Sequence, residues 1–204
     1  LPRFAALHST ATLSLALLVT GASLPLLALG WTVSGLAIAA LVGHRGTASA
    51  QRAADYVRRS LLRSDALLWT AVAVAVAVLP SLDRSALAES VASASGAAVT
   101  LLALLLVAAA VIRSALFPAH RWLFETAEAP SPVSALLHAG VVNIGGFLLI
   151  RMAAVLNLVP SAQWLLVVVG SLTAVVAGLV MMTRISVKVM LAWSTCAQMG
   201  FMLM

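Results

Sequence analysis

Two residues of this sequence have the chemistry to move charge across a membrane, because each is an ionisable group inside an apolar run. Arg113 lies five residues before Pro118, and His138 lies six residues after Pro132. At about 1.5 Å of helix per residue, both groups are expected about 7 to 9 Å from the same membrane surface. If their helices pack together, a fixed positive charge stands beside a histidine that titrates near neutral pH, which suits proton movement or anion steering. Alternatively, Arg113 extends to the interface, and His138 hydrogen bonds a neighbouring helix, for example through Ser134.

Two acidic residues, Glu125 and Glu128, lie near the segment between these groups, where prolines interrupt the helical pattern. Pro118, Pro130 and Pro132 each remove a backbone donor and crowd the preceding turn, so we expect a helix broken near Pro118. A backbone broken at membrane depth must line a cavity or be buried in protein. The glutamates are candidates for a mouth that collects ions; alternatively, they are ordinary exposed loop charges.

The composition indicates which solvent these elements meet. Of the 204 residues, 63% are apolar and 9% are charged, whereas a soluble domain has about 25% charged residues. In water such a chain would expose large apolar patches, which excludes an ordinary soluble enzyme, and so much apolar character also excludes disorder. The predicted fold class is an all-α polytopic membrane protein with about seven transmembrane helices, at about 20 residues a span.

Clusters of Lys and Arg separate the apolar runs that we expect to span the membrane. A turn of small residues at 21–23 joins the first two runs; alternatively, these form one long helix kinked at Pro25. The predicted spans are residues 4–20, 24–42, 66–79, 97–117, 133–150, 165–183 and 189–204.

The positive charges predict which connections face the cytoplasm. When connections are assigned to alternate sides, nine Lys and Arg gather on one side, and Arg84 and Arg151 fall on the other. The positive-inside rule places loops 44–63, 119–131 and 184–188 in the cytoplasm, and it explains the net charge of +6 without nucleic acid. Loop 44–63 carries five arginines against Asp55. It lies on the membrane surface as an amphipathic helix or, as we favour, only anchors the topology.

The sequence contains no pattern for bond-making chemistry. It lacks a phosphate-binding glycine loop, a nucleophile triad and a His-Glu metal-binding spacing. Its one cysteine, Cys196, permits neither an internal disulfide nor a cysteine zinc cluster. We therefore predict a transport subunit rather than an enzyme, with no metal and no cofactor in this chain.

Two longer stretches carry motifs. Residues 113–138 read RSALFPAHRWLFETAEAPSPVSALLH, close to KSAQFPLHxWLPDAMxGPTPVSALIH, and residues 187–201 read VKVMLAWSTCAQMGF, close to IKRVLAYSTxSQxGY. These patterns resemble the antiporter-like membrane subunits of complex I (subunit L type) and of multisubunit Mrp cation/proton antiporters. The resemblance implies about fourteen helices in two inverted five-helix repeats. Residues 1–204 would then be one transmembrane domain and a fragment of a longer chain, with the first repeat at about 4–151 and the start of the second at about 162–204.

The departures from this family pattern concern charges. The family has a Gly-Trp-Glu whose buried Glu pairs with the broken-helix lysine; here the triplet ends at Thr32, and the lysine position holds Arg113. The resemblance therefore implies that the usual ion pair of the first half-channel is absent. Because arginine stays protonated, Arg113 would act only as a fixed charge. His138 keeps the position of the family's relay residue, and Lys188 belongs to the second motif.

Asn143 and the glycines after it, together with these losses, are most similar to the membrane subunits of two-component inorganic-carbon transporters, the DabB type. This resemblance implies a subunit of the bacterial inner membrane that translocates protons or sodium ions and energises uptake of CO2 or bicarbonate. Its partner would be a large soluble zinc-binding subunit resembling carbonic anhydrase (DabA type). The alternative is a proton-pumping subunit of NADH:quinone oxidoreductase or of a cation/proton antiporter, with other complex I membrane subunits as partners; a scaffold without conduction is the third possibility.

Overall fold

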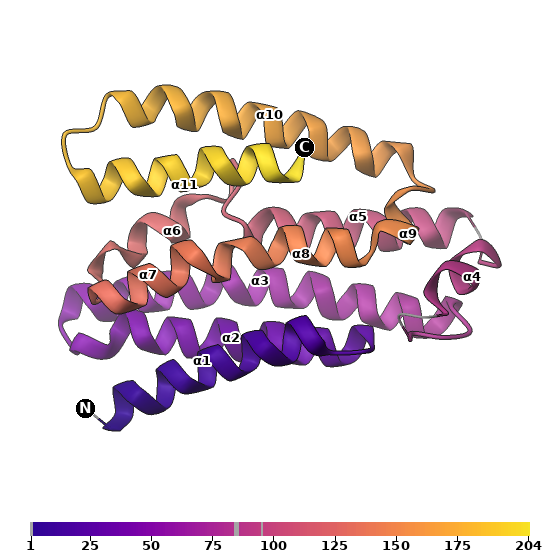
Figure 1. The fold of residues 1–204 in the computed structure, drawn as a ribbon, viewed down its shortest axis with the longest axis horizontal. Helices are drawn as coiled ribbons and strands as arrows, with labels where there is room; N and C mark the ends of the chain where they lie inside the picture. Colours follow the sequence, from indigo (N-terminus) through magenta and orange to yellow (C-terminus); the bar gives the residue numbers. More distant parts are fainter. Residues whose placement is uncertain (1, 84–85, 95) are drawn as a thin grey trace.

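The computed structural model describes residues 2–83, 86–94 and 96–204. Long helices run side by side in a bundle, and short helices and turns connect them (Figure 1). Prolines stand in the first turn of the helices that begin at Leu24, Ser131 and Pro160, where the missing backbone donor costs nothing. The elements are α1 (Pro2–Thr20), α2 (Leu24–Val42), η1 (Gly43–Arg45), α3 (Ala48–Val78), α4 (Leu87–Ala92), α5 (Gly96–Arg113), α6 (Arg121–Glu125), η2 (Thr126–Glu128), α7 (Ser131–Ala139), η3 (Val141–Asn143), α8 (Ile144–Arg151), α9 (Ala153–Leu156), α10 (Pro160–Met182) and α11 (Val187–Leu203).

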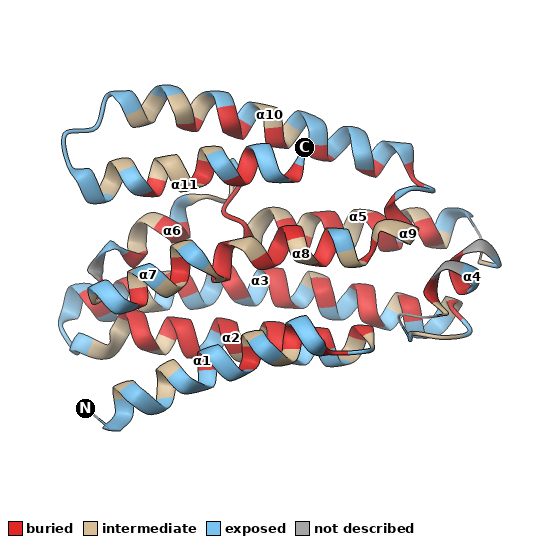
Figure 2. Ribbon diagram, viewed as in Figure 1, coloured by how far each residue is buried: buried red, intermediate tan, exposed pale blue. Residues whose placement is uncertain are grey.

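The membrane class predicted from composition is confirmed. Within the described ranges, six helical segments are long and apolar enough to cross a membrane, and α11 is a shorter apolar helix. The first two predicted spans are separate helices, α1 and α2, so the single kinked helix is excluded. Many large apolar side chains of α10 are exposed, and so are Leu13 and Val19 of α1; Figure 2 colours the exposed residues of both helices pale blue. Those surfaces suit lipid rather than water.

The predicted loop 44–63 is wrong, because most of it belongs to a transmembrane helix. Helix α3 runs unbroken from Ala48 to Val78. Its start is fixed by Thr47, whose side chain accepts a hydrogen bond from the Ala50 backbone N–H at 3.2 Å. Thirty-one residues make about 46 Å of helix, which exceeds the hydrocarbon thickness of about 30 Å. The arginines therefore decorate the protruding end of a span, and the predicted span 66–79 began too late.

The predicted helix break near Pro118 is confirmed, and it begins earlier than expected. Helix α5 ends at Arg113 instead of continuing to Phe117. Ala115 has a φ of 52°, and the Phe117–Pro118 peptide bond is cis. Residues 114–116 are buried, as a broken backbone at membrane depth must be.

Hydrogen bonds from neighbouring helices satisfy the polar groups of this break. The Ser114 hydroxyl donates to the Val142 carbonyl at 2.7 Å, and the Phe117 backbone N–H donates to the Thr173 hydroxyl at 3.0 Å. The Trp122 indole N–H donates to a carbonyl at the end of α5 at 2.8 Å. The break is therefore fixed by η3, α10 and α6 together.

A second break divides the predicted span 133–150. Helix α7 ends at Ala139, η3 follows Gly140, and α8 continues from Ile144. The Asn143 side-chain amide donates to the Ala139 carbonyl at 2.8 Å, so it stabilises the end of α7 locally. His138 therefore lies beside a helix end and not in the middle of a regular span.

The three basic segments predicted to share a side lie at one end of the bundle, where Figure 1 places the α2–α3 link, α6 with α7, and the α10–α11 link. Arg151 lies at the opposite end, where it donates to the Val19 carbonyl in the last turn of α1 at 2.7 Å. Arg84 lies outside the described residues.

Gly145 sets how closely α8 approaches α5, and its replacement by alanine tests that packing. A Cβ there would come within 2.1 Å of the Ser114 hydroxyl and 2.8 Å of the Ala110 carbonyl oxygen. We expect Gly145→Ala to lower the free energy of unfolding by about 1 to 3 kcal/mol through overpacking. The measurement is thermal unfolding of the full-length protein in detergent. Gly178→Ala is the control, because a Cβ there meets open space; equal stability of the two variants would contradict this packing.

Candidate ion pathway

Arg113 is fully buried at the end of α5, so its predicted alternative, extension to the interface, is excluded. One terminal nitrogen, Nη2, donates to the Trp31 carbonyl at 3.0 Å and to the Ser34 hydroxyl. The guanidinium carbon lies 5.1 Å from the centre of the Trp31 ring, within reach of a cation–π interaction. Helix α2 thus surrounds the positive charge with oxygen and aromatic partners.

Gly35 provides the space that this guanidinium occupies. A Cβ at Gly35 would lie 2.7 Å from Nη1 of Arg113, which is closer than van der Waals contact allows. The glycine therefore allows the charged group to pass close to the α2 backbone. Because Ser34 is its neighbour in sequence, one turn of α2 both admits and binds the guanidinium.

The counter-charge is Asp65, a residue that the sequence reasoning missed. Its carboxylate on α3 lies 3.8 Å from Nη1 of Arg113, and both side chains are buried. The usual ion pair with an acid at the Thr32 position is absent, and an acid of α3 pairs with Arg113 instead. Asp65 escaped notice because it stands between the predicted basic loop and the predicted span. A signal was present, since Leu61, Ser64, Asp65 and Leu68 follow the i, i+3, i+4, i+7 spacing of a buried helix face.

Charge rather than hydrogen bonding joins this pair. Within the described part of the chain, neither carboxylate oxygen of Asp65 has a hydrogen-bond partner, and neither do Nε and Nη1 of Arg113. Ser64, beside Asp65, instead donates to the Ala109 carbonyl of α5 at 2.8 Å, which ties the two helices together. The carboxylate can therefore change its protonation state without first breaking a hydrogen bond to protein.

Thr32, which occupies the position of the family's glutamate, faces another neighbour. Its hydroxyl accepts a hydrogen bond from the Trp69 indole N–H at 3.0 Å. Thr32 is thus hydrogen-bonded to Trp69 of α3, whereas the preceding residue, Trp31, contacts Arg113. The side chain at position 32 of α2 therefore takes no part in the ion pair between Arg113 and Asp65.

His138 belongs to a second centre, between α7 and α11. Its Nδ1 lies 2.9 Å from the Thr195 hydroxyl, which itself donates to the Leu191 carbonyl at 2.9 Å. Because that hydroxyl directs its one proton to Leu191, Nδ1 of His138 is assigned as the donor, and Nε2 as the basic nitrogen of the neutral ring. This tautomer follows from the hydrogen-bond network.

A small cavity joins His138 to two other predicted site residues. It has a volume of about 10 Å³, and Ser134, His138 and Lys188 are among the residues that line it. This volume is at the lower limit for one water molecule. The Lys188 ammonium donates to the carbonyls of Ala127 and Ala129, the latter at 3.4 Å. Lysine, serine and histidine thus meet where η2, α7 and α11 converge.

Arg113 and His138 therefore belong to separate centres. The guanidinium faces α2 and α3, whereas the imidazole faces α11. The proposed side-by-side arrangement of the two is not what the structure has.

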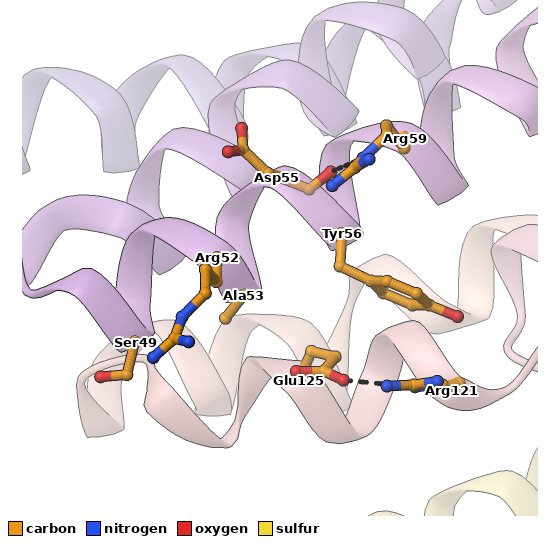
Figure 3. Close-up of a pocket in the computed structure, with 8 residues that line it drawn as sticks. All are labelled: Ser49, Arg52, Ala53, Asp55, Tyr56, Arg59, Arg121 and Glu125. Atoms are coloured by element: carbon orange, nitrogen blue, oxygen red, sulfur yellow. Dashed lines mark hydrogen bonds and ion pairs between the residues drawn. The ribbon is translucent and has the colours of Figure 1, made fainter.

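Glu125 lies at the basic end and borders a different cavity from the one at His138, although its neighbours Phe124 and Thr126 line the latter. It pairs with Arg121 at 3.3 Å and borders a cleft of about 480 Å³ between α3 and α6, which Figure 3 shows. The side chain of Glu128 lies outside the described residues. Among the residues that the structure does describe, no three His, Cys, Asp or Glu gather to hold a metal ion.

This chain is similar in sequence to a family of membrane subunits and to several known proteins. The model of the NADH:quinone oxidoreductase/Mrp antiporter transmembrane family matches residues 21–204. A probable inorganic carbon transporter subunit DabB of Hydrogenovibrio crunogenus is 58% identical over 101 residues, which are 50% of this chain and 20% of that protein. NADH-quinone oxidoreductase subunit L of Mycobacterium tuberculosis is 32% identical over 94% of this chain and 30% of its own length.

A solved structure, that of the Mrp complex from Dietzia sp. DQ12-45-1b, matches 96% of this chain with a TM-score of 0.84 and 33% identity. The match covers 22% of that chain. Each of these three matches thus covers less than a third of the other protein's length.

The buried pair of Arg113 and Asp65 leads to a prediction about the free energy of unfolding. Arg113→Gln leaves the Asp65 carboxylate without its counter-charge, so we expect the free energy of unfolding to fall by about 3 kcal/mol or more. The double variant Arg113→Gln with Asp65→Asn removes both charges and should recover most of that loss. Thermal unfolding of the full-length protein in detergent measures both effects.

Arg58→Gln is the matched control, because Arg58 pairs with Asp55 at 3.2 Å on the exposed side of α3. Its effect should stay within about 1 kcal/mol. If the double variant is no more stable than Arg113→Gln alone, the two charges do not stabilise each other.

Proposed function

Because this chain belongs to the NADH:quinone oxidoreductase/Mrp antiporter transmembrane family, we propose that it translocates protons or sodium ions across the bacterial inner membrane and energises uptake of CO2 or bicarbonate. The similarity to a protein named as a probable inorganic carbon transporter subunit supports this cargo. The proposed partner is a large soluble zinc-binding subunit of the DabA type. The basic end of the bundle faces the cytoplasm in this proposal, by the positive-inside rule.

One observation carries the ion-translocating role, namely the buried ion pair between Asp65 and Arg113 at 3.8 Å. Arginine keeps its proton under protein conditions, so Asp65 is the member of the pair that binds and releases the cation. Buried ionisable residues in spanning helices are costly and usually mark ion paths. In this mechanism Arg113 supplies a fixed field that keeps Asp65 ionised between transfers.

His138 is the relay of the second centre. Its donating Nδ1 is held by Thr195, which leaves Nε2 to accept a proton. Lys188 and Ser134 line the same small cavity, and the ammonium charge of Lys188 favours prompt release of a proton from His138. Asn143 holds the end of α7 in place, while Glu125 stands at the cytoplasmic surface.

The repeat organisation is part of the same proposal. The first five-helix repeat covers about residues 4–151, and α10 and α11 begin the second at about 162–204. The chain is then a fragment of a longer two-repeat protein, and the exposed apolar faces of α10 and α11 adjoin the rest of the second repeat.

A second candidate function is that of a proton-pumping subunit of NADH:quinone oxidoreductase or of a multisubunit cation/proton antiporter. The similarity to subunit L over 94% of this chain favours it, as does the likeness to the Mrp complex. The charge pair and the histidine centre would serve either protein.

Growth in air distinguishes these functions. The full-length protein is expressed with its candidate zinc partner in a host that lacks carbonic anhydrase, and growth in ambient air is scored. We expect rescue by the natural protein and loss of rescue in Asp65→Asn and in His138→Ala, because each removes a titrating group from the path. Asp55→Asn, at an exposed position of α3, and His8→Ala, at a half-buried position of α1, are the matched controls and should rescue normally.

Membrane abundance of every variant is measured beside growth, so that loss of protein is recognised. Rescue that survives His138→Ala would exclude the relay role, and rescue that survives Asp65→Asn would exclude the carboxylate. No rescue by the natural protein, together with copurification with a quinone reductase, would favour the second function.

A further inference from the structure

The cleft between α3 and α6 is a surface that the ion pathway does not use. It has a volume of about 480 Å³ at the basic end of the bundle, and three arginines line it: Arg52, Arg59 and Arg121. Tyr56 lies among them, with the Arg121 guanidinium 4.9 Å from the centre of its ring. Figure 3 shows these side chains around the cleft. We propose that this cleft binds the phosphate headgroup of an anionic phospholipid.

The balance of charge inside the cleft favours an anion. The two acids that border it each have a basic partner, because Asp55 pairs with Arg58 at 3.2 Å and Glu125 pairs with Arg121 at 3.3 Å. Arg52 and Arg59 instead donate from Nε to backbone carbonyls, those of Ala48 and Asp55, both at 3.2 Å. These neutral partners orient the two guanidinium groups and leave their charge in excess.

The depth of the cleft fits a headgroup. Counted back from the end of α3 at Val78, 20 residues make about 30 Å, the thickness of the hydrocarbon layer. That count reaches Arg59, and Arg52 lies about 10 Å further out along the helix axis. Tyr56 stands between them, at the level where interfacial tyrosines gather. The arginines therefore meet the phosphate layer of the membrane.

The same face of α3 continues into the membrane as a lipid-exposed strip. Ala66, Thr70, Ala73 and Ala77 are exposed, and they follow Arg59 and the exposed Arg63 at helical spacing on one side. Their small side chains leave room for an acyl chain alongside the helix. A ligand with a phosphate group and an acyl chain matches a basic cleft that continues into a strip of small residues. A soluble acidic protein would contact only the basic cleft.

Lipid retention tests this assignment. The full-length protein is purified in detergent, and binding of phosphatidylglycerol, phosphatidylcholine and inorganic phosphate is compared by native mass spectrometry. We expect selective binding of phosphatidylglycerol. Since each basic residue near a membrane surface contributes about fivefold to affinity, Arg52→Ala with Arg59→Ala should weaken that binding about 25-fold.

The control is Arg45→Ala with Arg184→Ala, which removes the same charge from the same end outside the cleft and should bind as the natural protein does. Glu125→Gln removes a competing negative charge and should strengthen binding, an effect that a purely structural residue would not produce. Thermal unfolding in phosphatidylcholine alone shows that the variants are folded. Should the double variant unfold, Arg52→Ala and Arg59→Ala singly should each weaken binding about fivefold.

Three results would overturn the proposal. Equal loss in the double variant and in the control would mean general surface attraction. Binding of inorganic phosphate as strong as that of phosphatidylglycerol would mean a site for free anions. Unchanged lipid binding in the double variant, combined with loss of an acidic soluble partner, would mean a protein-docking surface.

Discussion

A positive charge that cannot be neutralised, held inside a lipid-embedded bundle, is the constraint on which the arrangement of α2, α3 and α5 depends. Arg113 keeps its proton, so the surrounding helices must supply both a counter-charge and oxygen acceptors. Asp65 provides the first, and the Trp31 carbonyl with the Ser34 hydroxyl provides the second. Gly35 leaves the space in which these groups meet. The positions of three long helices are thereby coupled through one side chain.

The two helix breaks impose a similar requirement on the backbone, because its buried polar groups also need partners. Peptide groups released from a helix in a membrane need partners. The Phe117 N–H donates to the Thr173 hydroxyl of α10, and the Ser114 hydroxyl donates to the Val142 carbonyl of η3. The breaks also place ionisable groups at helix ends, with Arg113 ending α5 and His138 one residue before the end of α7. Regular helices would have carried both groups past their partners.

Aromatic packing connects the first break to the last helix. The His120 ring lies 5.2 Å from the Trp193 ring, and the Phe124 ring lies 4.6 Å from it, measured between ring centres. These contacts join α6 to α11, the helix that also carries Thr195 and Lys188. A shift of the broken segment would therefore displace the partners of His138, which gives the two separate centres a physical connection.

Local chemistry in the sequence determined the membrane class, the number of apolar runs, the break near Pro118 and the grouping of basic segments at one end. The length of an apolar run, a proline and a charge each affect the residues close to them in sequence, so the sequence alone is enough to interpret them. Tertiary packing alone decided that Asp65 faces Arg113, that Thr32 turns to Trp69 and that His138 faces α11. Each of these depends on how a helix is rotated about its axis against a partner far away in sequence. Arg113 and its acceptor Trp31 are 82 residues apart in sequence, and no local sequence pattern relates residues so far apart.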